Sequence, residues 1–427
     1  MKRRDFLSTA AVAATAGTLS MSQRVARADD EKTLRLAVIG TGWYGMVDAK
    51  AALNAGSVEI AAICDVDSEH LSQSADELES LQGKKPATYK LYEEMLNDEE
   101  LDGVIIGAPP HWHALMLLAC LDRGIDVYCE KPLSYDVREG QAMVEAVEAS
   151  DCVVQIGFQR RQSQAFREVK EFIASGGIGN LVQVDAQIHY RAGLKDNTPQ
   201  DPPAALDWDL WSGPGPMIPY SPQVGHKSWR LEQTSGHGHL IDWGIHLIDA
   251  CRMILDAGMP SSITAAGGLY QYKDRITTPD TLSVHFEFEP CPVFWRHRLW
   301  GATEYMPETN NGIFFYGDEG TIFATDRKWT VVRGREAVKE EHEVPVDLGG
   351  LHMVDFLEAV RTRRPTACPV REGFRTTSTV QLAMIAYESD SIVKWDADAK
   401  ELIGGTPEAN ALLRREYRAP HEHPYTM

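Results

Sequence analysis

The chain of 427 residues is 43% hydrophobic, which is sufficient for a large buried core, and its length favours two or three domains. Its formal net charge is -20, and since residues 1–28 carry five basic side chains and one acidic one, the remainder carries -24. Such a charge excludes nucleic-acid binding through a basic face.

The amino-terminal segment, residues 1–28, is predicted to be an export signal. Residues 3–7 are Arg-Arg-Asp-Phe-Leu, an apolar, alanine-rich run follows from Ala10 to Leu19, and Ala28 ends an Ala-Arg-Ala sequence. Paired arginines before a moderately apolar stretch are typical of a twin-arginine signal, with cleavage after Ala28. The alternative is a disordered terminus. No later stretch has the roughly 18 apolar residues of a membrane-spanning helix, so the mature protein is expected to be soluble or peripheral, in the periplasm or secreted.

Seven cysteines are spread singly along the chain, and no two have the C-x-x-C spacing of a zinc or redox site. They are predicted to be small buried residues without a disulfide framework, although an oxidising compartment would permit disulfides.

From residue 34, short apolar runs alternate with amphipathic stretches, a pattern typical of strands and crossover helices in a parallel sheet. The predicted strands are Leu34–Ile39, Val58–Cys64, Gly103–Ile106, Asp126–Cys129 and Val153–Ile156. The predicted helices between them are Ser68–Leu81, His113–Arg123 and Val137–Ala149. These elements predict an α/β, doubly wound Rossmann domain over residues 29–157.

The first predicted strand is followed directly by a glycine-rich loop that opens a helical pattern, Gly40-Thr41-Gly42-Trp43-Tyr44-Gly45. In a dinucleotide-binding fingerprint the first glycine permits a tight turn, the second lets the backbone approach the pyrophosphate, and the third allows close packing of helix and strand. Asp65 follows 25 residues after Gly40 and ends the second predicted strand, where its carboxylate can bind the adenosine ribose and would repel a 2′-phosphate. The loop, with Trp43 and Tyr44, and Asp65 therefore predict an NAD site rather than an NADP site. The alternative is a simple turn.

Two further predicted strands end in segments rich in proline and polar residues. Residues 107–113 are Gly-Ala-Pro-Pro-His-Trp-His, and residues 128–132 are Tyr-Cys-Glu-Lys-Pro. Because ligands of open α/β sheets bind beyond the carboxyl ends of the strands, Pro109, His113, Glu130 and Lys131 are expected to face the cofactor. Lys131 is the leading candidate for catalysis.

After residue 157 the predicted strands are longer, richer in aromatic residues and often alternate between polar and apolar positions. They are Leu181–Tyr190, Ile263–Tyr272, Thr281–Phe288, Val293–Trp300 and Thr321–Thr325. Such strands, joined by turn residues, predict an α/β domain over residues 158–427, built on a large, mostly antiparallel sheet with one open face.

The stretch 192–238 interrupts this domain with many prolines and glycines and with four large aromatic residues, Trp208, Trp211, Tyr220 and Trp229. Irregular segments of this length are usually functional or disordered, and the aromatic rings favour function. The rings could stack on a sugar while basic side chains bond to its hydroxyls, or they could form a subunit interface. The basic candidates are Arg191, His226, Lys227 and Arg230.

Asp242, His246 and Asp249 are spaced i, i+4, i+7, which would place them on one face of a helix. Asp242 could then fix the orientation and tautomer of the imidazole, and His246 could exchange a proton with the substrate. An ordinary polar helix face is one alternative. Metal binding by His237, His239, Asp242 and His246 is another, since imidazole suits zinc, but oxidation of an alcohol needs no metal and none is predicted.

These motifs, in this order, resemble the glucose-fructose oxidoreductase, inositol dehydrogenase and rhizopine-catabolism (Gfo/Idh/MocA) family over nearly all of the chain after residue 28. The matching segments are the glycine loop, Asp65, the helix start at His113 and residues 130–132, 157–161 and 242–249. The resemblance implies a Rossmann domain followed by an α/β domain whose open sheet often forms the interface of a homodimer or homotetramer.

The resemblance also implies an active site formed by Lys131, Asp242 and His246, with Arg160 matching a substrate-contacting arginine. The other candidates for substrate binding are Arg161, Tyr190, Trp211, His239 and Asp242 itself. The chain departs from the family's small cytoplasmic members in its export signal, its insertion over residues 192–238 and its carboxy-terminal extension over residues 406–427.

The expected function is therefore an exported NAD(P)-dependent oxidoreductase that transfers a hydride between tightly bound nicotinamide and a secondary alcohol of a sugar, glycoside or polyol. The protein has to manage the hydroxyl proton, with Lys131 either as the base or as a hydrogen-bond donor beside a histidine base. NAD is a cytosolic metabolite, so an exported enzyme is expected to load it before export and to regenerate it within each cycle. The alternatives are an NAD-dependent glycoside hydrolase that uses transient oxidation in the same site, and a non-enzymatic nucleotide- or sugar-binding module.

Overall fold

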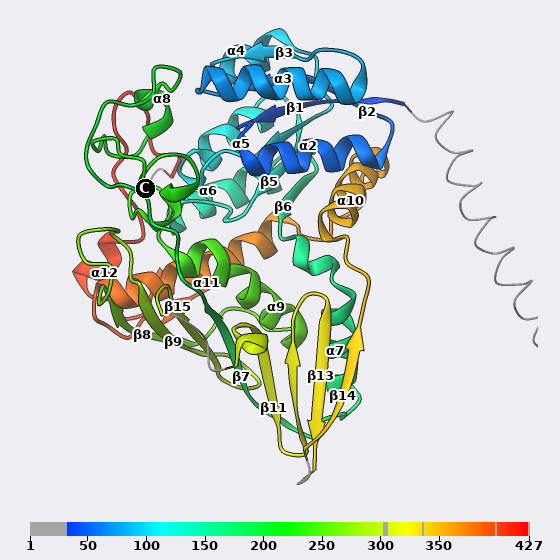
Figure 1. The fold of residues 1–427 in the computed structure, drawn as a ribbon, viewed down its shortest axis with the longest axis vertical. Helices are drawn as coiled ribbons and strands as arrows, with labels where there is room; N and C mark the ends of the chain where they lie inside the picture. Colours follow the sequence, from blue (N-terminus) through cyan, green and yellow to red (C-terminus); the bar gives the residue numbers. More distant parts are fainter. Residues whose placement is uncertain (1–31, 302–305, 335–336, 398, 426–427) are drawn as a thin grey trace, which may run out of the picture.

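The computed structural model describes residues 32–301, 306–334, 337–397 and 399–425, which form two sheets with their covering helices (Figure 1). The predicted export signal, residues 1–28, lies outside the described residues. Within the described part of the chain, no helix combines the length and the apolar character of a membrane span.

The first sheet is six-stranded and parallel, in the order β3-β2-β1-β4-β5-β6. Its strands are β1 (Leu34–Ile39), β2 (Val58–Cys64), β3 (Ala87–Tyr89), β4 (Gly103–Ile106), β5 (Asp126–Glu130) and β6 (Val154–Gly157). The crossover helices are α2 (Trp43–Ala55), α3 (Ser68–Gln82), α4 (Tyr92–Asp98), α5 (His113–Leu121) and α6 (Val137–Glu148). The winding reverses between β1 and β4, the switch point at which doubly wound sheets bind ligands, so the predicted fold of this part is confirmed.

All five strands predicted from apolar runs are present; β5 extends one residue further than predicted, and both ends of β6 are displaced by one residue. The helices begin where a side chain caps them: the Asp67 carboxylate accepts from the first backbone N–H groups of α3, and Asp136 does the same for α6. The short elements β3 and α4 were not predicted. All seven cysteines are free and six of them are buried, as expected.

The second sheet has eight strands in the order β14-β13-β12-β11-β7-β10-β9-β8. They are β7 (Leu181–His189), β8 (Ser262–Gly268), β9 (Thr281–Glu287), β10 (Val293–Arg298), β11 (Asn311–Gly317), β12 (Gly320–Ala324), β13 (Lys328–Arg333) and β14 (Val338–Glu343). Neighbouring strands are antiparallel except for β7 and β10, so the predicted mostly antiparallel sheet is confirmed. Buried and more exposed residues alternate along β9 and β10, which leaves one face open.

The strand predicted over residues 263–272 ends early, at Gly268. The backbone N–H groups of Tyr270, Gln271 and Tyr272 donate to the carboxylate of Asp280 instead of to a neighbouring strand. Strands β11, β13 and β14 were not predicted, and β14 has the charged, exposed sequence of an edge strand.

The covered face of the second sheet packs against α7 (Gln164–Ala174), α9 (Ile245–Leu255) and α11 (Val370–Glu388). Helix α10 (Leu348–Thr362) instead returns to the Rossmann part, where Phe356 lies in the core with Leu36 and Val38. The remaining short elements are η1 (Pro110–Trp112), η2 (Gln159–Gln162), α8 (Trp208–Ser212), η3 (His226–Leu231), η4 (Leu240–Gly244), η5 (Pro307–Thr309), β15 (Trp395–Asp396), β16 (Glu401–Leu402) and α12 (Pro407–Ala411).

The insertion, residues 192–238, and the carboxy-terminal tail lie beside each other next to the Rossmann part (Figure 1, green and red). The Arg418 guanidinium donates to the backbone oxygens of Gly213 and Gly215 and pairs with Asp209. The backbone N–H of Ser68, at the start of α3, donates to the carbonyl oxygen of Ala205. These contacts hold the insertion over the carboxyl end of the first sheet.

Candidate active site

The three loop glycines differ in what a side chain would meet. A Cβ atom on Gly40, whose φ is +86°, would lie 2.6 Å from the backbone nitrogen of Ala108, and one on Gly45 would lie 1.9 Å from the carbonyl oxygen of Gly40. A Cβ on Gly42 would meet nothing within 4 Å. The first and third glycines are therefore required by close backbone packing, whereas the second leaves open space at the amino terminus of α2, where a phosphate can approach.

Asp65 directly follows β2 and holds the glycine loop in place. Its carboxylate accepts hydrogen bonds from the backbone nitrogen of Thr41 at 2.7 Å, from the Thr41 hydroxyl at 3.1 Å and from the backbone nitrogen of Asp67 at 2.9 Å. Burial raises the pKa of this carboxyl, against the opposing effect of these bonds. The side chain also lines the cavity beside the loop, the position expected of a ribose ligand.

A cavity of about 540 Å³ extends from the glycine loop to the end of β4. Its walls include Gly42, Trp43, Tyr44 and Asp65 from the Rossmann part, Pro109 and Trp112 beyond β4, Trp211, His226, Lys227, Trp229 and Arg230 from the insertion, and His421 from the tail. The open space at Gly42, the carboxylate at the end of β2 and the largely apolar walls fit a dinucleotide such as NAD. The insertion thus forms a roof over the predicted cofactor site.

Of the predicted cofactor contacts, His113, Glu130 and Lys131 are not among the residues that line this cavity. Both ring nitrogens of His113 are 2.8 Å from backbone oxygens, those of Ala108 and Pro132, so His113 joins two loops. Glu130 is buried and accepts from the amide of Gln159 at 2.5 Å. Burial raises the pKa of Glu130 to about 7, although Lys131 works in the opposite direction.

Lys131 and Asp242 lie together, as predicted, at the junction of the two sheets. The Lys131 ammonium donates to the backbone oxygen of Asp242 at 2.7 Å and to its carboxylate at 3.1 Å. Arg230, from the insertion, donates to the same carboxylate oxygen at 3.0 Å. Burial opposes ionisation, yet Lys131 and Arg230 hold the pKa of Asp242 below its usual range. Sequence reasoning named Arg230 only as a partner for hydroxyls and missed this contact.

The predicted pairing of Asp242 with His246 is not observed. Asp242 lies in η4, a π-helical turn, so the spacing of an α-helix does not apply between the two residues. The Nδ1 atom of His246 is buried and has no hydrogen-bond partner among the described residues. Burial, with Lys131 and Arg160 nearby, holds the pKa of His246 well below its usual value, so the ring is neutral.

Asp249 and Arg161 form a structural ion pair away from the site. The Arg161 guanidinium donates to both oxygens of Asp249, at 2.8 and 2.7 Å, and Thr376 donates to the same carboxylate. The Asp249 carboxylate is thus occupied by Arg161 and Thr376, and these contacts give Arg161 a structural role rather than the predicted substrate contact.

We expect Arg161→Ala to lower the free energy of unfolding by about 3–5 kcal/mol, the cost of leaving one partner of a buried ion pair uncompensated. Urea unfolding measures this, and Arg371→Ala is the control because Arg371 and its partner Glu148 are both exposed and the loss should stay within about 1 kcal/mol. If Arg161→Ala keeps native stability and instead raises the KM for the substrate, Arg161 contacts the substrate as the sequence predicted.

The other predicted substrate residues divide into two groups. Arg160 lies over the ring of Trp243, which is 40% exposed, and pairs with Asp326 at 3.4 Å, while Tyr190 lies against His239 with ring centroids 5.0 Å apart. Trp211 instead lines the dinucleotide cavity and stacks on Trp208. Trp243 was not predicted, although an aromatic residue directly after Asp242 was a signal for it.

The alternative metal site of His237, His239, Asp242 and His246 is not formed. Across the described residues, two groups of His, Cys, Asp or Glu bring three ligand atoms close together, and neither contains any of these four. His237 lies against the ring of Tyr135 with centroids 4.2 Å apart, and His239 is buried between Tyr190 and His297.

Comparisons with known proteins agree with this arrangement. The model of the Gfo/Idh/MocA oxidoreductase family with an NAD-binding Rossmann fold matches residues 34–158, and the model of that family's C-terminal alpha/beta domain matches residues 165–423. An inositol 2-dehydrogenase of Salmonella paratyphi B is 33% identical over 172 residues, which cover 39% of this chain and 50% of the relative. The chain thus spans about half the length of the curated inositol 2-dehydrogenases of Salmonella that it matches.

Two further similarities extend over more of the chain. A glycosyl hydrolase family 109 protein of Stenotrophomonas maltophilia is 26% identical over 309 residues, covering 67% of this chain and 64% of the relative. An oxidoreductase of Agrobacterium radiobacter, solved with NAD+, L-tartaric acid and magnesium, superposes with a TM-score of 0.67 at 17% identity, over 85% of this chain and 98% of that one. The last similarity shows the fold alone.

Proposed function

The chain belongs to the Gfo/Idh/MocA oxidoreductase family, and from that membership we propose that it transfers a hydride between NAD and a secondary alcohol of a sugar, glycoside or polyol. The observation that carries the proposal is the contact of Lys131 with Asp242, at 2.7 and 3.1 Å, beside an NAD-binding Rossmann domain. The inositol 2-dehydrogenase relative supports the choice of a polyol or sugar as substrate.

Lys131, Asp242 and His246 have different roles in the removal of the substrate's hydroxyl proton. Bound NAD supplies the hydride acceptor. Of the three N–H groups of the Lys131 ammonium, two are directed to Asp242, so one remains for the substrate oxygen. Asp242, itself held by Arg230, orients that ammonium. The pKa of His246 is held well below its usual value, so the ring is neutral, and we assign it the role of accepting the proton while Lys131 stabilises the oxygen that loses it. Of the two roles predicted for Lys131, these contacts favour hydrogen-bond donation.

We further propose that the protein is exported with its cofactor. The twin-arginine sequence of residues 3–7 supports export, and the roof formed by the insertion and His421 supports slow release of NAD. Protein recovered from the periplasm is expected to contain nearly stoichiometric NAD(H) when it is denatured and its nucleotides are analysed by mass spectrometry. Empty periplasmic protein would contradict retention, and protein found only in the cytoplasm would contradict export.

The second candidate function is an NAD-dependent glycoside hydrolase that oxidises, eliminates, adds water and reduces within one cycle. The similarity to a glycosyl hydrolase family 109 protein favours it. Release of the aglycone from a synthetic aryl glycoside without net NADH would establish this function, whereas NADH formation from the free sugar would establish net dehydrogenation.

The homodimer or homotetramer expected from the open sheet stays a prediction that analytical ultracentrifugation can check.

A further inference from the structure

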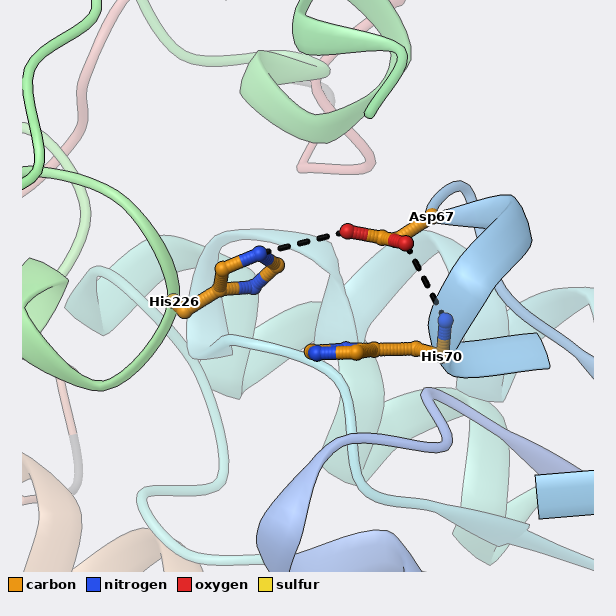
Figure 2. A group of neighbouring side chains, drawn as sticks. All are labelled: Asp67, His70 and His226. Atoms are coloured by element: carbon orange, nitrogen blue, oxygen red, sulfur yellow. Dashed lines mark hydrogen bonds and ion pairs between the residues drawn. The ribbon is translucent and has the colours of Figure 1, made fainter. Parts of the chain in front are cut away.

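Asp67, His70 and His226 form a cluster where α3 meets the insertion (Figure 2). Asp67 caps α3, His70 lies in the first turn of that helix, and His226 begins η3. The two imidazole rings face each other with centroids 4.5 Å apart, and the Nε2 atom of His226 lies 3.2 Å from the second carboxylate oxygen of Asp67. One ligand-type atom from each residue lies within 4.8 Å of the other two.

Several electron-pair donors of this cluster are not used by the protein. One oxygen of Asp67 accepts from the backbone nitrogens of Glu69 and His70, while the other faces only His226. Among the hydrogen bonds of the described residues, His70 takes part through its backbone nitrogen, which donates to Asp67, while its ring contacts the ring of His226. Two ligands about 2.0 Å from one tetrahedral ion lie about 3.3 Å apart, so the spacing between Asp67 and His226 suits joint coordination.

The second group of this kind is already saturated. In Asp136, Glu139 and His423, each carboxylate oxygen accepts at least one hydrogen bond, from backbone nitrogens, Arg415, Tyr417 or His423 itself. An arginine paired with Glu139 also supplies the positive charge that an ion would bring. The cluster of Asp136, Glu139 and His423 is therefore satisfied by contacts within the protein, whereas the cluster of Asp67, His70 and His226 keeps electron-pair donors that an ion could use.

The charges around the first cluster favour a cation over an anion. A helix amino terminus ordinarily attracts a phosphate, but the Asp67 carboxylate already occupies the first N–H groups of α3. Asp65 lies two residues away and would also repel a phosphate. Two imidazoles and one carboxylate match the ligands that zinc takes, with a fourth position left for water.

We propose that Asp67, His70 and His226 bind a divalent transition-metal ion, with Zn²⁺ as the best match. Because two ligands come from the Rossmann part and one from the insertion, the ion would fasten the roof to α3. His70 and His226 both line the dinucleotide cavity, so this fastening would slow the release of NAD. That consequence rests on the proposed function, whereas the binding of the ion does not.

The test is a titration of tag-free, full-length, metal-free protein with Co²⁺, whose visible absorption reports a four-coordinate site, followed by displacement with Zn²⁺. One ion per chain is expected. His70→Asn and His226→Asn should each weaken Co²⁺ binding by more than about tenfold, since even the loss of groups that only support a ligand costs 10–100-fold. His342→Asn is the matched control, because His342 lies 3.2 Å from Glu340 but has no third ligand.

Two further readouts keep the test decisive. Zn²⁺ should raise the Tm of the wild type and not that of the two cluster variants, whose Tm without metal reports whether they fold. Zn²⁺ should also lengthen the half-life of bound NAD. Unchanged Co²⁺ binding in both folded variants would overturn the proposal. No substrate is needed, so failure here is distinct from failure of the proposed hydride transfer.

Discussion

Replacing Lys131 with alanine is expected to reduce hydride transfer by about 10²–10³-fold, the usual cost of removing one hydrogen-bond donor that stabilises a developing oxyanion, while NAD stays bound. Lys131 is not among the residues that line the dinucleotide cavity, so NAD binding is expected to persist without it. The Asp242 carboxylate keeps Arg230 as a partner at 3.0 Å, so the variant should fold. The measurement is single-turnover formation of bound NADH at 340 nm, with a sugar or polyol that the wild type oxidises, together with the nucleotide content of the purified variant.

Lys50→Ala is the matched control for Lys131→Ala. Lys50 lies on α2 of the same domain and pairs with Glu77 at 3.0 Å, with both side chains more than 40% exposed. Its loss should leave hydride transfer unchanged. Native activity of Lys131→Ala would remove Lys131 from the mechanism, and loss of both activity and bound NAD would assign it to cofactor binding instead.

The parts of the structure that follow from local sequence were predictable. Buried parallel strands are continuous apolar runs, and the glycine loop is recognisable because two of its three glycines have no room for a Cβ atom. The position of Asp65 at the end of β2 also follows from strand length alone. By contrast, β14 has the sequence Val-Lys-Glu-Glu-His-Glu, whose charges carry no strand pattern, and it pairs only because β13 provides an edge.

The residues at the centre of the site could be predicted from the sequence, whereas the ion pairs between residues far apart in the chain could not. The contact between Lys131 and Asp242 followed from two motifs of the family that the chain resembles. The pairing of Arg161 with Asp249, 88 residues apart, leaves no periodic signal, so motif position alone suggested substrate binding for one and a catalytic helix face for the other. The i, i+4 spacing also failed to predict how Asp242 and His246 are arranged, because Asp242 lies in the π-helical turn η4. The extra residue that such a turn inserts into a helix is not visible in the composition of the sequence.

Gly42→Ala is expected to raise the Kd for NAD by about 10–100-fold without destabilising the protein. The backbone of Gly42, with φ −63° and ψ −172°, accepts an alanine, and the added methyl group meets no protein atom within 4 Å. It would instead project into the space where the phosphates of the cofactor approach the backbone, and overpacking of this kind typically costs about 1–3 kcal/mol. The retained nucleotide, quantified by mass spectrometry, and the quenching of tryptophan fluorescence by added NAD measure the loss.

Two other glycines separate cofactor binding from folding. In Gly45→Ala the new Cβ would lie 1.9 Å from the carbonyl oxygen of Gly40, so this variant should lose folding stability as well as NAD. In Gly349→Ala, on α10, the Cβ meets nothing within 4 Å and lies outside the cavity, so both NAD content and Tm should stay at or above the wild-type values. Native affinity for NAD in Gly42→Ala would show that the backbone at this glycine does not approach the phosphates, and the loop would then serve the cofactor through the close backbone packing at Gly40 and Gly45.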